Sequence, residues 1–186
     1  TERGHVTVLG AGNAGQQAVD VVASLGANVT VFDINTDKLS LLQQKYPNVT
    51  GLVPTPQQLE EAVISSDLLI GAVLATGRKT PVIVSAGLVS KMEPGSVIID
   101  IAVDQGGCIE TIHPTTYEAP TYFEHAVLHF GVTNMPGAVP RTATQALSAA
   151  IMPYVQKLAD GQLHMDSALK RGINLENGEV VHPALL

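Results

Sequence analysis

The chain has 186 residues, 45% of them hydrophobic, and a formal net charge of -7 at pH 7. This length suits one domain with at most a small appendage, and the apolar content is sufficient for a sizeable core. The acidic balance and the scattered basic residues argue against nucleic acid as a partner. A single cysteine excludes an intrachain disulfide framework and fits a reducing, cytoplasmic compartment.

No apolar run approaches the roughly 18 residues of a membrane span, so no membrane partner is expected. There is no signal peptide pattern. The chain begins at Thr1 and not at Met, and it enters a predicted strand almost at once. We therefore expect it to be a piece of a longer protein.

The beginning of the chain is its most informative segment, because an apolar run leads into Gly10-Ala-Gly12-Asn-Ala-Gly15. Glycines at this spacing between a strand and a helix are typical of a dinucleotide site. We predict that Gly10 permits a tight turn, Gly12 lets backbone approach a pyrophosphate, and Gly15 lets the helix pack against the strand. The N-terminus of that helix would offer free N–H groups to the phosphates.

An acid, Asp33, stands at the end of the second apolar run, 18 residues after Gly15. At the tip of a strand it is placed to accept hydrogen bonds from the ribose hydroxyls of an adenosine, and it would repel a 2′-phosphate. The sequence therefore favours NAD over NADP. The alternative is a turn or helix-cap role for Asp33. Lys38, one turn into the next helix, is a further ribose contact or a solvated surface lysine.

Six apolar, β-rich runs alternate with helical patterns along the first 130 residues. Most of them are continuously apolar, as expected of parallel strands that are covered on both faces. With right-handed crossovers they predict an α/β fold with a doubly wound parallel sheet of the Rossmann type, in the order 3-2-1-4-5-6. The predicted strands are Val6–Leu9, Asn28–Phe32, Val49–Val53, Leu68–Val73, Ser96–Ala102 and Val127–Phe130.

Four helices are predicted between these strands. The first covers residues 14–25 and ends at Gly26, a typical glycine just past a helix. The second opens at Thr36, with an acid in its first turn, and ends before Pro47. The third has Thr55 as its N-cap and Pro56 at its first position. A short fourth helix spans Ser85–Lys91.

The character of the chain changes after Phe130, where a proline-rich loop leads into an apolar helix over Thr142–Leu158 with a proline expected to kink it. A short helix near Asp166–Arg171 and a polar tail follow. We predict a dinucleotide-binding Rossmann domain over residues 1–140 and appended C-terminal helices over 141–186. The long helix is too apolar for a free surface element, so it should pack against other protein.

Two segments at the carboxyl ends of predicted strands are further candidates for the site, because ligands bind there in open parallel sheets. Asp104 follows a buried strand and precedes a glycine pair, where it faces a ligand or forms a turn with its own backbone. Asp100, in mid-strand, is expected to be a buried structural acid. Asn134 and Met135 follow the sixth strand, where they contact a nicotinamide or form an ordinary loop. No His, Cys or Asp cluster has metal-ligand spacing.

Several runs together resemble the L-alanine dehydrogenase family, which is related to the proton-translocating transhydrogenases. The resemblance extends from Val6 almost to the C-terminus, and it implies an NAD-dependent oxidoreductase that interconverts L-alanine with pyruvate and ammonia. It also implies a homo-oligomer, with a hexamer as the family pattern. The runs are residues 31–39, 67–74, 104–108, 113–116, 134–140 and 181–184.

The resemblance also implies which residues form the site. Asp104 matches the catalytic aspartate of the family. His113 falls at a further cofactor position that is often Arg in the family, so its role is open. The implied cofactor contacts, together with the glycines of the turn, are Gly10, Gly12, Asn13, Ala14, Gly15, Asp33, Lys38, Val73, Leu74, Ile101, Ala102, Val103, Asp104, Val132, Thr133, Asn134 and Met135.

In this family the substrate-binding Arg and Lys and a catalytic His lie in an N-terminal region that is absent here. We therefore expect this chain to be the NAD-binding half of an alanine dehydrogenase, with residues 141–186 made to pack on the missing substrate domain. Two alternatives remain open. One is the NAD(H)-binding module of a transhydrogenase, and the other is a non-catalytic NAD-sensing domain, for which Asp104 would be dispensable.

Overall fold

The structure is a computed structural model that describes residues 2–75, 77 and 79–186. The chain divides into two compact units, one ending at Thr133 and the other running from Asn134 to Leu186. The predicted division after residue 140 stays a prediction.

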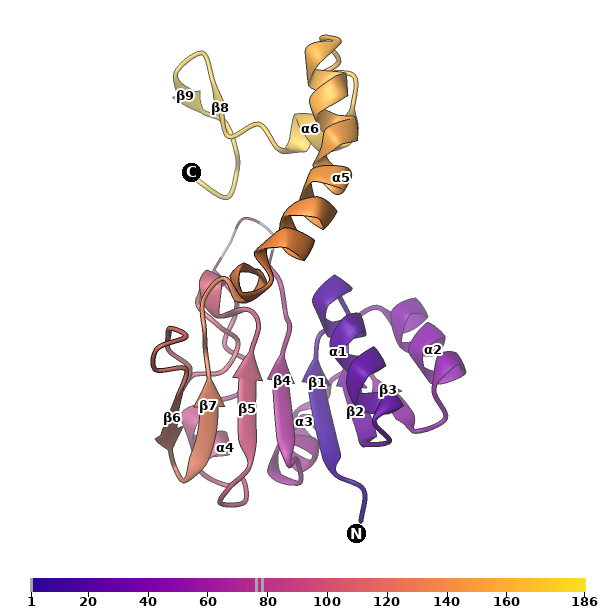
Figure 1. Cartoon of the computed structure of the whole chain (residues 1–186), viewed down its shortest axis with the longest axis vertical. Helices are drawn as coiled ribbons and strands as arrows, with labels where there is room; N and C mark the ends of the chain where they lie inside the picture. The colour runs from indigo at the N-terminus through magenta and orange to yellow at the C-terminus, as the bar shows by residue number, and fades with distance from the viewer. Residues whose placement is uncertain (1, 76, 78) are drawn as a thin grey trace. The chain divides into compact units, whose positions relative to one another are not determined.

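The first unit is built on one seven-stranded sheet with the order β3-β2-β1-β4-β5-β7-β6 (Figure 1). Every pairing is parallel except that of β6 with β7. The six predicted strands are therefore present in the predicted order, and the Rossmann-type α/β fold is confirmed. The strands are β1 His5–Leu9, β2 Asn28–Phe32, β3 Val49–Leu52, β4 Leu68–Gly71, β5 Val97–Asp100, β6 Thr121–Glu124 and β7 Val127–Phe130.

The strand β6 departs from the prediction of a purely parallel sheet. It forms a hairpin with β7 through His125 and Ala126, whose φ angles are 53° and 61°. Positive φ at both central residues is the geometry of the preferred two-residue hairpin turn, which Asn and Gly usually provide. Because this turn has neither residue, the sequence carried no hairpin signal, and no strand was predicted between residues 102 and 127.

The four predicted helices of the first unit are present: α1 Asn13–Ser24, α2 Thr36–Lys45, α3 Pro56–Ile64 and α4 Ala86–Val89. Side chains cap three of them. Asn35 accepts hydrogen bonds from the first turn of α2, Thr55 accepts one from Gln58 at the start of α3, and Ser85 accepts one from Leu88 in α4. The cap at Thr55 agrees with the prediction, because hydroxyl side chains satisfy the free N–H groups of a helix start. Ser85, predicted as the first residue of the fourth helix, is its cap instead.

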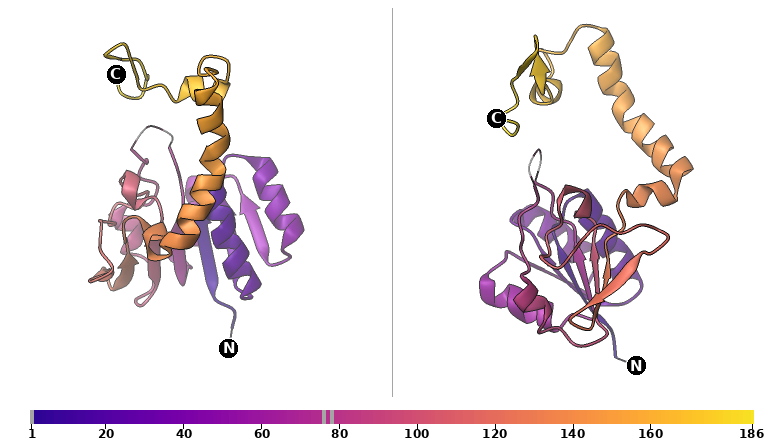
Figure 2. Two further views of the ribbon diagram at one scale, coloured as in Figure 1. Left: turned by 45° about the horizontal axis from the view of Figure 1, so that its top comes forward. Right: turned by 90° about the vertical axis from the view of Figure 1, so that its left-hand side faces the viewer.

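The core forms two apolar clusters, one on each face of the sheet. One cluster joins the strands to α1 and α2 and includes Val8, Val19 and Leu39. The other joins the strands to α3 and α4 and includes Val63 and Val89. Figures 1 and 2 show α1 and α2 on one side of the strands and α3 on the other. Covering on both faces explains why the strands are continuously apolar.

The second unit contains a 3-10 turn (η2, Met135–Ala138), the helices α5 Pro140–Ala159 and α6 Ser167–Arg171, and a small hairpin of β8 Leu175–Glu176 with β9 Glu179–Val180. Both helices were predicted, and the hairpin was not. Pro153 lies inside α5, and none of the residues of α5 is buried. Its exposed apolar side chains include Leu147, Ile151 and Val155.

Candidate functional site

A cavity of about 580 Å³ lies where the carboxyl ends of β1, β2 and β4 meet. The glycine turn, the end of β2, the start of α2 and the residues after β4 all contribute to its walls. It brings together seven of the predicted site residues, namely Gly10, Gly12, Asn13, Asp33, Lys38, Val73 and Leu74. The remaining lining residues are Leu9, Phe32, Ile34, Asn35, Pro54, Leu59, Ala72 and Ile83.

The three glycines of the turn have different surroundings. Gly10 has a φ of 95°, and a Cβ there would lie 2.7 Å from the carbonyl oxygen of Ala72. A Cβ on Gly15 would overlap the carbonyl oxygen of Gly10, whereas a Cβ on Gly12 would meet no atom within 4 Å. Gly10 and Gly15 are therefore required by the protein's own packing, and the space beside Gly12 is open to a ligand.

The N-terminus of α1 borders this open space. Gly12 is its N-cap, and no side chain caps the helix. The first N–H groups of any helix have no partner inside it, and they lie at the positive end of the helix dipole. Asn13 and Ala14 in this first turn are exposed. The arrangement is suited to an anionic group such as a phosphate.

Asp33 follows β2 and is half-buried at the wall of the cavity. Its Oδ2 accepts a hydrogen bond of 2.6 Å from the N–H of Ala11, and its Oδ1 accepts one of 2.8 Å from the N–H of Asn35. The carboxylate therefore has the turn role that the sequence left as an alternative. Carboxylate oxygens have about four lone-pair positions in all, so two such bonds leave room for ribose hydroxyls.

Lys38 lies in the first turn of α2, half-buried, and lines the cavity. Its N–H donates to Oδ1 of the helix cap Asn35 at 3.2 Å. Three apolar lining residues, Ile34, Pro54 and Leu59, were not singled out from the sequence. In the sequence, the available signal for Ile34 was a large apolar residue directly after Asp33. In the structure this side chain is 87% exposed, which is unusual for an isoleucine and points to a ligand surface.

The segment after β5 places Asp104 in an exposed position on a short 3-10 turn, η1 Val103–Gln105. Ala102 and Val103 are buried beneath it, and the N–H of Ile101 donates to the carbonyl of Gly71 at 2.7 Å. None of residues 101–104 lines the 580 Å³ cavity. Their place in a cofactor site thus stays a prediction.

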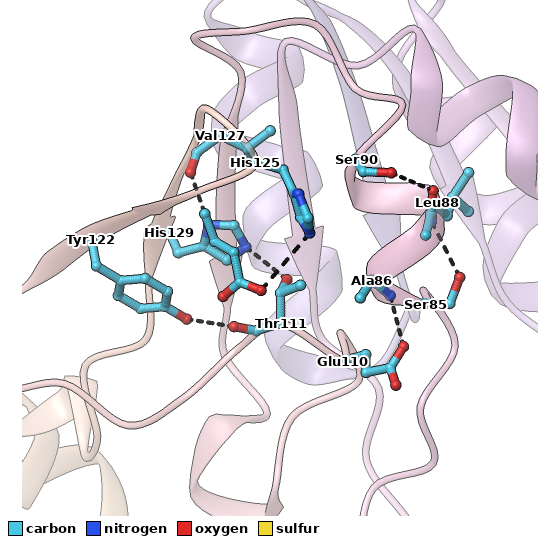
Figure 3. A network of polar contacts seen from close by, with 12 residues as sticks. Ser85, Ala86, Leu88, Ser90, Glu110, Thr111, Tyr122, His125, Val127 and His129 are labelled. Carbon is cyan, nitrogen blue, oxygen red and sulfur yellow. Dashed lines mark hydrogen bonds and ion pairs between the residues drawn. The ribbon is translucent and has the colours of Figure 1, made fainter.

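The loop that follows Asp104 is hydrogen-bonded to the strands β6 and β7 through Thr111 (Figure 3). His129 is buried in β7. Its Nδ1 lies 3.0 Å from the carbonyl of Val127, and its Nε2 lies 2.8 Å from Oγ1 of Thr111. Since a carbonyl only accepts, Nδ1 has the proton and Nε2 accepts from the hydroxyl. Burial lowers the pKa of His129, which favours this neutral form.

His113 belongs to the same loop, and its ring is stacked on Tyr122 of β6, with centroids 3.7 Å apart. The backbone N–H of His113 donates to the hydroxyl of Tyr122, and that hydroxyl donates to the carbonyl of Thr111 at 2.8 Å. These contacts show a structural role for His113. A cofactor contact by its exposed ring stays a prediction.

The last predicted contacts, residues 132–135, are divided between the units. Val132 is buried and Thr133 donates its N–H to the carbonyl of Thr115 at 3.3 Å. Asn134 and Met135 belong to the second unit, where Asn134 has a left-handed φ of 49°. Within the described residues, no cluster of three or more His, Cys, Asp or Glu side chains is arranged to hold a metal ion.

No helix in the described part of the chain is long and apolar enough to span a bilayer.

The chain is similar to alanine dehydrogenases along most of its length. It is 43% identical over 189 residues to the enzyme of Bacillus subtilis (strain 168), covering 98% of this chain. It is 45% identical over 186 residues to the enzyme of Mycolicibacterium smegmatis, covering 97% of this chain. Each match includes 50% of the relative, so the chain spans about half the length of these curated relatives.

Two solved structures resemble it. An L-alanine dehydrogenase has a TM-score of 0.84 and 49% identity, covering 98% of this chain and 52% of that one. A transhydrogenase from Sinorhizobium meliloti has a TM-score of 0.79 at 24% identity, covering 99% of this chain and 51% of that one, and is alike in fold. Residues 1–183 match the family described as alanine dehydrogenase/PNT, C-terminal domain. The resemblance indicated by the sequence is thereby confirmed, and the chain belongs to this family.

Proposed function

We propose that the chain is the NAD-binding half of an alanine dehydrogenase, an enzyme that reversibly converts L-alanine to pyruvate and ammonia. The observation that supports this best is the cavity at the carboxyl edge of the sheet, where an uncapped helix start, the open side of Gly12 and Asp33 lie together. Such an arrangement offers donors to phosphates and an acceptor to a ribose. The identity of 43–45% to alanine dehydrogenases favours that reaction over transhydrogenation.

The residues of the cavity fit an adenosine diphosphate group. The first turn of α1 binds the pyrophosphate beside Gly12, and Asp33 accepts hydrogen bonds from the ribose hydroxyls. Ile34, Pro54 and Leu59 provide apolar surface for the flat base. The negative charge of Asp33 disfavours a 2′-phosphate, so the cofactor is NAD and not NADP.

The nicotinamide end of the cofactor lies, in this proposal, near Val73, Leu74, residues 101–104 and residues 132–133. Bound NAD supplies the acceptor for the hydride that leaves the α-carbon of alanine. The carboxylate of Asp104 stabilises the positive charge that develops at the amino group as the hydride departs. This makes Asp104 the catalytic residue contributed by the chain.

The remainder of the substrate site belongs to the other half of the protein. The groups that hold the carboxylate of alanine are expected there, and the apolar face of α5 with the rest of residues 141–186 packs against it. A cytoplasmic homo-oligomer, hexameric as in the family pattern, completes the proposal.

Calorimetric titration of the chain with NAD and with NADP tests the cofactor. We expect NAD to bind more tightly, and equal or tighter binding of NADP would refute the assignment. The isolated chain should not oxidise alanine, because orientation of a substrate against its reaction partner supplies up to about 7–11 kcal/mol and the orienting groups lie elsewhere. The full-length protein should oxidise L-alanine with NAD. Hydride exchange between NAD(H) and NADP(H) in place of alanine oxidation would favour the transhydrogenase alternative.

A further inference from the structure

Asp100 is a buried acid that the proposed chemistry does not use. It is the last residue of β5, and none of its surface is exposed. In the sheet it is paired with Gly71 of β4. A Cβ on Gly71 would lie 2.9 Å from the carboxyl carbon of Asp100 and 2.7 Å from Sγ of Cys108. Because Gly71 has no Cβ, the carboxyl of Asp100 and the thiol of Cys108 can occupy the space beside it.

The carboxyl of Asp100 accepts hydrogen bonds from both ends of the following loop. Its Oδ1 accepts from the N–H of Ala102 at 2.8 Å, and its Oδ2 accepts from the N–H groups of Cys108 and Ile109 at 2.7 and 3.3 Å. The thiol of Cys108 lies beside the same carboxyl, because both groups approach the Cβ position of Gly71. One side chain thus fixes residue 102 relative to residues 108 and 109.

Asp104 lies between these two ends. The carbonyl of Ala102 accepts from the N–H groups of Gln105 and Gly107 at 2.9 and 3.0 Å, and these bonds shape the turn that presents Asp104. Gly107 has a φ of 74°, and a Cβ there would lie 2.9 Å from Oδ2 of Asp100. The turn is therefore closed around the carboxyl of Asp100, with the side chain of Asp104 on its exposed surface.

A carboxyl in this position is not explained by core packing. Burial raises the pKa of Asp100, although the bonds from Cys108, Ala102 and Ile109 oppose that shift. Burying a polar group costs free energy unless its hydrogen bonds are made, and an apolar residue such as the buried Ile98 of the same strand would avoid that cost. What the carboxyl adds is the ordering of the loop.

We propose that Asp100 is the positioning residue for Asp104, whose carboxylate it places by closing the loop of residues 101–109. This inference rests on the proposed function, because it assigns Asp100 to the reaction in which Asp104 takes part. Asp100 does not line the dinucleotide cavity. Its loss is therefore expected to slow the chemical step and to leave the binding of NAD nearly unchanged.

The substitution Asp100→Asn in the full-length protein tests the proposal. An amide has one acceptor oxygen, so either the bond from Ala102 or the bonds from Cys108 and Ile109 are lost, and two N–H groups face each other. We expect kcat for alanine oxidation to fall at least about tenfold, which corresponds to about 1.4 kcal/mol, while the Kd for NAD changes less than about threefold. Ser66→Ala, which removes another buried polar group on the far end of the sheet, is the control for general destabilisation.

A double-mutant cycle with Asp104→Asn distinguishes positioning from a merely structural role. If Asp100 acts through Asp104, then Asp100→Asn has little further effect on kcat once the carboxylate of Asp104 is gone. The same loss in both backgrounds would overturn the proposal, as would an unchanged kcat in the single variant. Single-turnover measurements with enzyme in excess keep the slow variants measurable.

A second variant covers the case in which Asp100→Asn does not fold. Cys108→Ala removes the thiol that packs beside the carboxyl of Asp100, and we expect a loss in kcat of about threefold, with the same dependence on Asp104. A loss that is independent of Asp104 contradicts the proposal. Wild-type protein without alanine oxidation would refute the proposed function, whereas an active wild type with an equally active Asp100→Asn variant refutes only this inference.

Discussion

The carboxylate of Asp33 accepts a hydrogen bond of 2.6 Å from the backbone N–H of Ala11, and this bond connects the end of β2 to the glycine turn after β1. The acid proposed to bind the ribose therefore also fixes the loop proposed to bind the pyrophosphate. In the proposed site, recognition of the sugar and recognition of the phosphates are therefore joined through one side chain.

Substitution of Asp33 is expected to affect NAD binding and stability together. Asp33→Ala should weaken NAD binding by roughly 1.5–3 kcal/mol, the typical value for hydrogen bonds to a charged group, and it should narrow the preference over NADP. Asp33→Asn keeps one acceptor and removes the charge, so it should relax the NADP discrimination with a smaller loss in thermal stability. Calorimetry and melting curves measure both effects. An unchanged NAD affinity in Asp33→Ala would show that the acid is only a turn residue.

Two glycines of the turn form a matched pair for substitution. Gly15→Ala should lower the free energy of unfolding by about 1–3 kcal/mol, because its Cβ overlaps the carbonyl oxygen of Gly10. Gly12→Ala should leave stability nearly unchanged, because its Cβ points into open space, but the methyl group should weaken NAD binding at least about tenfold. Denaturant unfolding and calorimetry separate the two outcomes. Normal NAD binding by a folded Gly12→Ala variant would show that the pyrophosphate does not bind beside this residue.

The thiol of Cys108 should be unreactive and should make stability fall at high pH. It is fully buried, and burial together with the nearby Asp100 raises its pKa above the ordinary value of 9.0. Above that pH the unfolded chain loses this proton and the folded chain keeps it, so the folded state loses stability as the pH rises. Cys108→Ala should flatten the decline above about pH 9 in melting curves. Rapid labelling of the native chain by a thiol reagent would contradict this environment.

Protonation of Asp166 at low pH should weaken the hydrogen bonds that its carboxylate accepts in the second unit. Its Oδ2 accepts from Nζ of Lys157 at 2.6 Å, and its Oδ1 accepts from the N–H groups of Ala168 and Leu169 at the start of α6. The hydrogen bond from Lys157 is the main cause of a pKa lowered to about 2. The stabilisation is present above the ordinary value of 3.8 and is lost as the pH falls towards about 2. The amide shifts of Ala168 and Leu169 should titrate with that midpoint, and Lys157→Met should move it upwards.

The sequence predicted those parts of the fold that depend on local patterns. The apolar runs gave the six parallel strands and their order, and Thr55-Pro56 marked the start of α3, since caps and hydrophobic periodicity are local properties. The strand β6 could not be found in this way, because its turn uses His125 and Ala126 in a conformation that these residue types seldom adopt.

The candidate site was accessible from the sequence at the glycine turn and at Asp33, where spacing along one βαβ unit places the groups together. The bonds of Asp33 to Ala11 and of Asp100 to Cys108 could not be predicted, since they join residues that only the fold brings into contact. The position after predicted strands made Asp104, Asn134 and Met135 candidates, whereas for residues 101–103 and 132–133 only the family resemblance indicated a cofactor role.

The two apolar clusters on opposite faces of the sheet have a consequence for combined substitutions. Val19 of α1 belongs to one cluster and Val89 of α4 to the other, and the backbone of the strands separates them. Substitutions at sites that share no partner have additive effects on the free energy of unfolding. Truncating both residues to alanine should therefore cost the sum of the two single losses, so that each half of the interior tolerates sequence drift independently of the other.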